Sequence, residues 1–198
     1  MSTAHGFLRL VALAALASAA GMAACNATYT LPPATEAPDS GTVTLWALTG
    51  TSLINPSAYS LLDNPPTVVR TDRSSDFDFA FDIEADSTHD TSAVFLPRGA
   101  VGLSMDGGLQ LSAGPFDAIT LAPTGGYQDS LPVKLSVGTV VIAASRSETC
   151  NFGYIYPIYG KMQITAIDWV DRSVTFQIVV DPNCGYRSLK SDTLPPSQ

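Results

Sequence analysis

The stretch 76–86 constrains the fold more than any other part of the chain, because its residues alternate in character with a period of two. Phe77, Phe79, Phe81 and Ile83 occupy every second position, and acids fill most of the positions between them. Successive side chains of a β-strand point to opposite faces, so the pattern predicts a strand with an apolar core face and a solvated acidic face. Such a one-sided strand is typical of an antiparallel sheet.

The remaining sequence favours an all-β fold. No segment of helix length keeps an apolar period of 3.6 residues, whereas many short apolar runs end in Gly, Pro or Asp. We therefore expect a single domain built as an antiparallel sandwich or irregular barrel. Further strands are expected at 42–48, 68–71, 93–96, 100–104, 109–112, 118–121 and 139–145, and one helical turn at 55–62.

The clearest hairpin lies near the end of the chain. It joins a strand at 161–170 to a strand at 173–181 and turns at Asp171 and Arg172. Its second strand alternates strictly, so four apolar side chains are expected on one face: Val174, Phe176, Ile178 and Val180. Both tryptophans, Trp46 and Trp169, fall within expected strands, and we expect them in the core.

The N-terminal residues have the order of a secretory signal. Arg9 precedes an apolar run at 10–20, which is too short to remain as a membrane-spanning helix. The next residues, Met22-Ala23-Ala24-Cys25, resemble a bacterial lipobox, in which the cysteine is lipidated and becomes the first residue of the mature chain. This resemblance implies a signal peptide at 1–24 and a membrane anchor of acyl chains, such as palmitate, on Cys25.

The resemblance to a lipobox also implies an extracytoplasmic location in the bacterial cell envelope, at the outer membrane or the cell surface. The alternative is ordinary cleavage after Ala19 or Ala24, which leaves Cys25 as a plain thiol. After the lipidated cysteine, residues 25–41 are rich in Thr, Pro, Ala and Ser and are expected to form a flexible tether. The β domain is expected at 42–189 and a polar tail at 190–198.

The number of cysteines is consistent with this expected extracytoplasmic location. Lipidation of Cys25 leaves Cys150 and Cys184, which would pair in an oxidising compartment. A bridge between them closes a loop of 34 residues and contributes about 3 to 4 kcal/mol through the entropy of the unfolded chain. The spacing of a CxxC metal or redox site is absent.

Composition excludes some functions. The chain has 45% hydrophobic and 14% charged residues and a net charge of −8, which is too apolar for disorder and too acidic for a nucleic-acid partner. Once a signal peptide is removed, His89 is the one remaining histidine, too few for a zinc site. Neither a nucleophile elbow nor a Gly-rich phosphate loop occurs.

We therefore expect a non-enzymatic protein with no catalytic residue, no metal and no cofactor. A carbohydrate-active enzyme that uses carboxylates alone is an alternative, because acids are plentiful in the chain.

Two segments are candidate ligand contacts. Tyr154, Tyr156 and Tyr159 follow Cys150 closely, and tyrosines on a loop tied by a disulfide form a good platform for a sugar, a flat ring or a protein. The alternative is a strand whose tyrosines cover the core. The second candidate is His89, which lies in a polar loop that can equally be an exposed turn.

Three strings resemble the HmuY-like β-rich bacterial lipoproteins. They are Ser-Asp-Phe-Asp-Phe-Ala-Phe-Asp at 75–82, Val-Gly-Thr-Val-Val-Ile at 137–142 and Tyr-Gly-Lys-Met-Gln-Ile at 159–164, and Phe77 stands where the family carries a tryptophan. The resemblance implies an all-β lipoprotein attached to the cell surface. It also implies haem as a ligand, bound in the best-known members by two histidines.

This chain lacks such a histidine pair. His89 with Met105 or Met162 could supply a His/Met pair instead, which is a known axial combination for haem iron. The main hypothesis is thus a lipid-anchored β domain that binds an unknown ligand or protein, and a haem-binding lipoprotein is the alternative.

Overall fold

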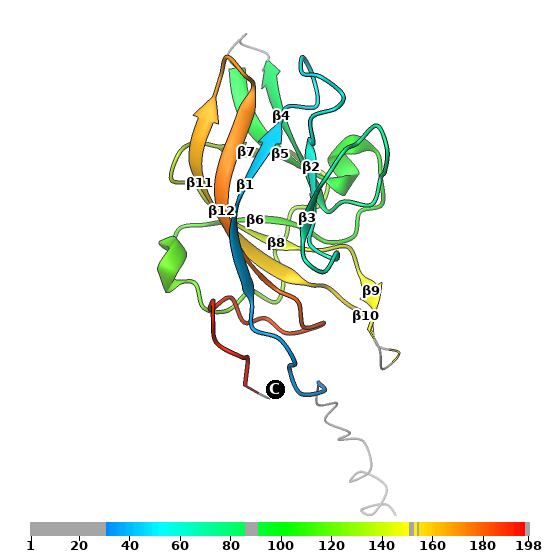
Figure 1. Ribbon diagram of the computed structural model, residues 1–198, viewed down its shortest axis with the longest axis vertical. Coiled ribbons are helices and arrows are strands. Elements are labelled where there is room, and N and C mark those ends of the chain that lie inside the picture. The colour runs from blue at the N-terminus through cyan, green and yellow to red at the C-terminus, as the bar shows by residue number, and fades with distance from the viewer. Residues whose placement is uncertain (1–30, 86–90, 151–152, 154, 197–198) are drawn as a thin grey trace, which may run out of the picture. The chain divides into compact units, whose positions relative to one another are not determined.

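The computed structural model describes residues 31–85, 91–150, 153 and 155–196. The chain divides into two units, Met1–Leu31 and Pro32–Gln198, and all the strands described below belong to the second. This unit contains two five-stranded antiparallel sheets that pack face to face as a sandwich (Figure 1). The expected all-β fold is confirmed. In the described part of the chain, no helix has the length and apolar character that crossing a bilayer requires.

The first sheet has the strand order β1-β12-β11-β8-β6 and the second has the order β3-β2-β4-β5-β7. The first sheet consists of β1 (Asp39–Trp46), β12 (Ser173–Asp181), β11 (Tyr159–Asp168), β8 (Val140–Ala144) and β6 (Gly108–Ser112). The second consists of β3 (Thr67–Val69), β2 (Ala58–Ser60), β4 (Phe79–Ala85), β5 (Thr91–Pro97) and β7 (Val133–Leu135). A small ribbon pairs β9 (Glu148–Thr149) with β10 (Ile155–Tyr156), and two 3-10 helices are η1 (Arg98–Val101) and η2 (Phe116–Ala118).

Aromatic rings join the two sheets. Phe176 of β12 lies with its ring centroid 6.1 Å from Tyr59, 6.2 Å from Phe79 and 5.5 Å from Phe95, which all belong to the second sheet. The expected shared face of β12 is confirmed, since its four alternating apolar residues are all buried in this core: Val174, Phe176, Ile178 and Val180.

The predicted acidic strand is found, but only the ends of its polar face, at Asp76 and Glu84, contact solvent. Phe79, Phe81 and Ile83 are in the core as expected, whereas Asp78 and Asp82 are only 3% and 6% exposed. The outer face of the second sheet carries apolar side chains, and η1 and the residues after it pack over them. The packing residues include Ala100, Val101 and Leu103. Phe77 precedes the strand and packs in that outer cluster instead of the core.

Three expected elements are different in the structure. The segment 100–104, expected as a strand, begins inside η1, which follows Pro97 and is capped by Gly102 with a φ of 79°. The segment 118–121, also expected as a strand, begins at the last residue of η2, where Lys161 donates hydrogen bonds to the carbonyls of Phe116 and Ile119, both at 2.9 Å. The segment 55–62 contains strand β2 rather than a helical turn, because its backbone pairs with β3 and β4.

The β11–β12 hairpin turns earlier than expected. The carboxylate of Asp168 accepts hydrogen bonds from the N–H groups of Val170 and Asp171, at 2.9 and 2.8 Å, which is an Asx-type turn. Trp169 therefore lies in the turn and is 51% exposed, so its expected place in the core is wrong. Trp46, at the end of β1, is half-buried.

The expected tether is partly docked onto the domain. Strand β1 begins at Asp39, and the side-chain oxygen of Asn183 accepts hydrogen bonds from the N–H groups of Thr35 and Glu36, at 2.8 and 3.3 Å. The hydroxyl of Tyr186 donates to the carbonyl of Pro32 at 2.7 Å. The β domain thus starts before residue 42, because C-terminal side chains bind the preceding backbone; residues 25–30 lie outside the described part.

The aromatic contact between the sheets makes a direct prediction. Replacing Phe176 by Ala should lower the free energy of unfolding by about 3 to 5 kcal/mol, because it leaves a cavity between two packed sheets. Trp169→Ala should change it by no more than about 0.5 kcal/mol, since that ring is half in solvent. Urea denaturation followed by circular dichroism measures both values, and similar losses for the two variants would contradict this account of the core.

Candidate functional site

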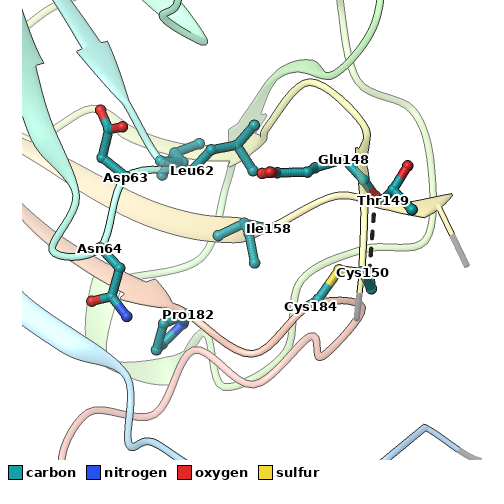
Figure 2. Close-up of a pocket in the computed structure, with 10 residues that line it drawn as sticks. Leu62, Asp63, Asn64, Glu148, Thr149, Cys150, Ile158, Pro182 and Cys184 are labelled. Carbon is teal, nitrogen blue, oxygen red and sulfur yellow. Dashed lines mark hydrogen bonds between the residues drawn. A yellow bond between two sulfur atoms is a disulfide. The ribbon is translucent and has the colours of Figure 1, made fainter. Parts of the chain in front are cut away.

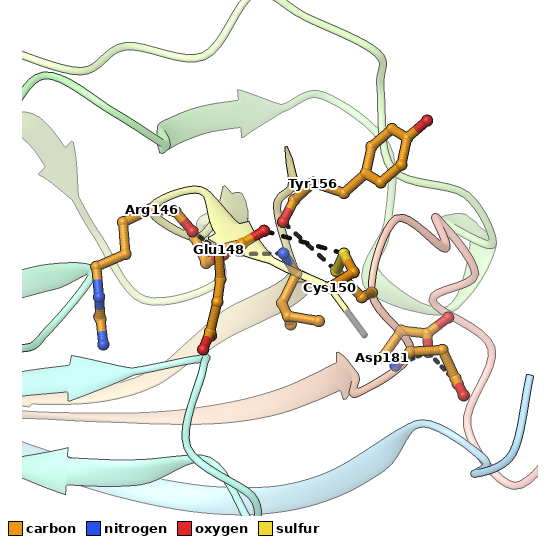
Figure 3. Close-up of a disulfide and its surroundings, with 9 residues drawn as sticks. Arg146, Glu148, Cys150, Tyr156 and Asp181 are labelled. Atoms are coloured by element: carbon orange, nitrogen blue, oxygen red, sulfur yellow. Dashed lines mark hydrogen bonds between the residues drawn. A yellow bond between two sulfur atoms is a disulfide. The ribbon is translucent and has the colours of Figure 1, made fainter. Parts of the chain in front are cut away.

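The disulfide predicted from the sequence is present and joins Cys150 to Cys184 (Figure 3). Cys150 directly follows β9, and Cys184 lies three residues after the end of β12. The bond therefore ties the small β9–β10 ribbon to the segment that follows the first sheet's longest hairpin. It also forms one wall of a pocket.

This pocket has a volume of about 190 Å³ and lies between the chain after β2, strand β9 and the residues around Cys184. Figure 2 shows the side chains of Asp63, Asn64 and Glu148 around it. Asp63 and Glu148 are exposed acids, and no ion pair holds either among the described residues. The remaining lining is mainly apolar: Leu61, Leu62, Ile158, Pro182 and the disulfide.

One buried carboxylate positions two walls of the pocket. Asp78 accepts a hydrogen bond from the N–H of Leu61 at 2.6 Å and another from the N–H of Arg146 at 2.8 Å. The Arg146 guanidinium lies 3.2 Å from the same carboxylate. Burial raises the pKa of Asp78, and these hydrogen bonds and the arginine partly offset that rise. Asp78 thus fixes the chain on both sides of the cavity.

The other buried acids also hold loops in place. Asp82 accepts hydrogen bonds from the N–H and hydroxyl of Thr49, at 3.2 and 2.9 Å, and lies 3.7 Å from the Arg172 guanidinium. Asp181 is fully buried, accepts two hydrogen bonds from Asn183, and has a pKa raised mainly by burial. These carboxylates are bound to protein groups, which favours a structural role for each of them.

The predicted tyrosine platform is only partly described. Tyr159 is 8% exposed and packs on the outer face of the first sheet, with its ring centroid 6.1 Å from that of Tyr127. It therefore matches the alternative in which tyrosines cover apolar surface. Tyr156 is half-buried in β10, and its ring projects away from the disulfide (Figure 3). Tyr154 and His89 lie outside the described residues.

The two methionines considered for a haem site lie in different environments. Met162 is fully buried in the core between the sheets, whereas Met105 is 69% exposed. Within the described ranges, no three His, Cys, Asp or Glu side chains come together as a group that could hold a metal ion.

Sequence reasoning missed the pocket residues. Asp63 and Glu148 are far apart in the chain, and neither belongs to a motif. The tyrosine segment after Cys150 drew attention to the right neighbourhood, since Cys150 and Glu148 line the cavity, but Asp63 on its other side could only be found from the fold.

Comparison with models of known families found no match for this chain. A search of curated proteins also found no match. The resemblance to HmuY-like lipoproteins therefore stays a prediction.

The buried tyrosines predict an abnormal alkaline titration. Burial, together with the charge of Asp39, raises the pKa of Tyr59 from 10.0 to about 12, and burial also raises the pKa values of Tyr127 and Tyr159. Because the unfolded chain loses these protons first, the stability contribution is complete below pH 10 and falls as pH rises toward about 12.

Phenolate absorbance against pH should show these tyrosines ionising only near or after alkaline unfolding. Tyr59→Phe should make the loss of stability between pH 10 and about 12 less steep. Ordinary titration of all tyrosines in the folded protein would contradict the burial described for them.

Proposed function

We propose that this chain is an extracytoplasmic lipoprotein, anchored through Cys25, whose β-sandwich binds a ligand rather than converting one. The disulfide is the observation that carries the proposal. Cys150 and Cys184 are bonded to each other, which supports an oxidising compartment and leaves Cys25 as the one cysteine outside the bridge. A single cysteine after a signal-like segment is the arrangement that lipidation needs.

The pocket beside the disulfide is the ligand contact in this proposal. Its floor is apolar, from residues such as Leu61 and Ile158, and Asp63 and Glu148 stand at its rim. An acidic rim over an apolar floor favours a cationic group on an apolar stem, as in an alkylamine or the side chain of a lysine. The pocket volume of about 190 Å³ is below the roughly 300 to 1,000 Å³ of a drug-sized site, which favours a small ligand group.

A binding role is favoured over catalysis by how the described acids are used. Asp78, Asp82 and Asp181 accept hydrogen bonds from the chain's own N–H groups, so their charges hold loops. Asp63 and Glu148 are exposed at the rim of the pocket, where their carboxylates are accessible to a cationic ligand.

Replacing Cys25 by Ser tests the anchor. The wild-type protein should fractionate with membranes and incorporate radiolabelled palmitate in a bacterial host. The Cys25→Ser protein should do neither and should still form the Cys150–Cys184 bond, as detected by non-reducing peptide mapping. Unchanged membrane retention of the variant would refute the anchor.

Butylammonium chloride tests the pocket. Its titration into the protein should shift the backbone amide NMR signals of Leu61 and Thr149 saturably, with weak affinity, whereas uncharged butanol should not. A protein carrying Asp63→Asn and Glu148→Gln should lose the response, and Asp76→Asn, an exposed acid elsewhere, should keep it. An equal response in all three proteins would show that the pocket does not select a cation.

A further inference from the structure

The end of the sandwich opposite the pocket carries an unusual surface. Strand β12 runs from Ser173, beside the β11–β12 turn, to Asp181, next to the disulfide segment. At its starting end, two loops expose large apolar side chains to solvent: Leu53 at 69%, Ile54 at 69%, Trp169 at 51% and Val170 at 91%. We call these four residues the apolar tip.

The two loops of the apolar tip are fastened together. The Arg172 guanidinium donates a hydrogen bond to the carbonyl of Thr49 at 2.9 Å and another to the carbonyl of Ile83 at 2.8 Å. Ala47 donates its N–H to the carbonyl of Arg172 at 2.8 Å. In Figure 1 both loops lie at the upper end of the sandwich, away from the C-terminus. The four exposed side chains thus belong to two loops that are hydrogen-bonded to each other.

Exposure of this kind has an energetic consequence. Water contact with large aliphatic and aromatic side chains is unfavourable, and clustered exposed apolar groups mark interaction sites more often than scattered ones do. Tryptophan is among the residues that contribute most to protein interfaces. The turn does not need a tryptophan for its own geometry, because the carboxylate of Asp168 fixes it.

The charges beside the tip select the partner. The segments 47–57 and 168–173 contain three charged residues, Asp168, Asp171 and Arg172. The Arg172 guanidinium is bound to Thr49, Ile83 and Asp82, whereas Asp168 and Asp171 are exposed. The exposed charges on these two described loops are therefore acidic.

We propose that the apolar tip docks a protein partner that presents an apolar patch bordered by lysine or arginine side chains. A second copy of this chain would bring acidic rims together, which disfavours self-association. An anionic lipid surface would be repelled by the same carboxylates. A protein with an apolar patch bordered by lysine or arginine would bury the apolar side chains of the tip and pair with its carboxylates. This surface is separate from the pocket and does not depend on the lipid anchor.

Site-specific photo-crosslinking in the cells that produce the protein tests the proposal. A photoreactive phenylalanine analogue at Ser52, an exposed tip position, should cross-link the full chain to one protein, and the same analogue at the exposed Thr124 should not. The cross-linked protein is then purified and titrated against the full chain by calorimetry.

The expected result is specific loss of affinity. The combined change Leu53→Ser and Trp169→Ser should weaken binding by about tenfold or more, and Asp171→Lys should weaken it and reduce its salt dependence. Leu121→Ser, an exposed apolar residue elsewhere, and Asp76→Lys should bind as wild type. Circular dichroism checks that each variant is folded.

Several results would overturn the inference. They are cross-links no stronger at Ser52 than at Thr124, cross-links to a second copy of the chain, binding of anionic vesicles that Trp169→Ser abolishes, or an affinity that the tip variants leave unchanged. Because the purified partner is titrated in solution, a failed anchor or an inactive pocket would leave these readings intact, so the outcomes are distinguishable from failure of the proposed function.

Discussion

The contact of Phe176 with Tyr59, Phe79 and Phe95 is the interaction on which the rest of the molecule depends, because it joins two sheets that share no hydrogen-bonded strand. Neither sheet has a long helix among the described residues to cover it. Each sheet therefore buries its inner face against the other and its outer face against loops. Removing apolar surface from water stabilises both sheets, and this stabilisation depends on the aromatic side chains that hold the two sheets packed together.

The covering loops are held by charged side chains that have been taken out of water. Asp78 binds the N–H groups of Leu61 and Arg146, and the amine of Lys161 binds the carbonyls of Phe116 and Ile119 and lies 4.4 Å from the Phe116 ring centroid. A buried charge is costly unless every polar partner is supplied, so each group tolerates one loop conformation. Through these hydrogen bonds Asp78 positions the two chain segments that flank the pocket beside the disulfide. Burial lowers the pKa of Lys161 for the same reason that it raises the pKa of Asp78.

The alternation of apolar and polar residues predicted the positions of the strands well, but it did not predict which of their polar side chains are buried. Strand 173–181 was predictable to the residue, because Val174, Phe176, Ile178 and Val180 alternate without interruption. The burial of Asp78 was not, because it depends on Arg146, which is 68 residues away. Trp169 falls within the strand expected from the sequence, but the carboxylate of Asp168 forms the turn and the strand ends before Trp169. The disulfide followed from counting cysteines, whereas the pocket is lined by Asp63 and Glu148 from two segments that are far apart in the sequence.

The hydrogen bond from Tyr186 to the carbonyl of Pro32 determines how far the domain could move from a membrane. In the anchored protein that we propose, Cys25 and the docked Pro32 are seven residue steps apart. At about 3.3 to 3.6 Å per fully extended residue, those steps span at most roughly 23 to 25 Å. The side chain of Tyr186, near the C-terminus, thus limits the length of the N-terminal segment between the domain and the lipid. Truncation before Tyr186 would lengthen this segment and let the sandwich lie further from the lipid headgroups.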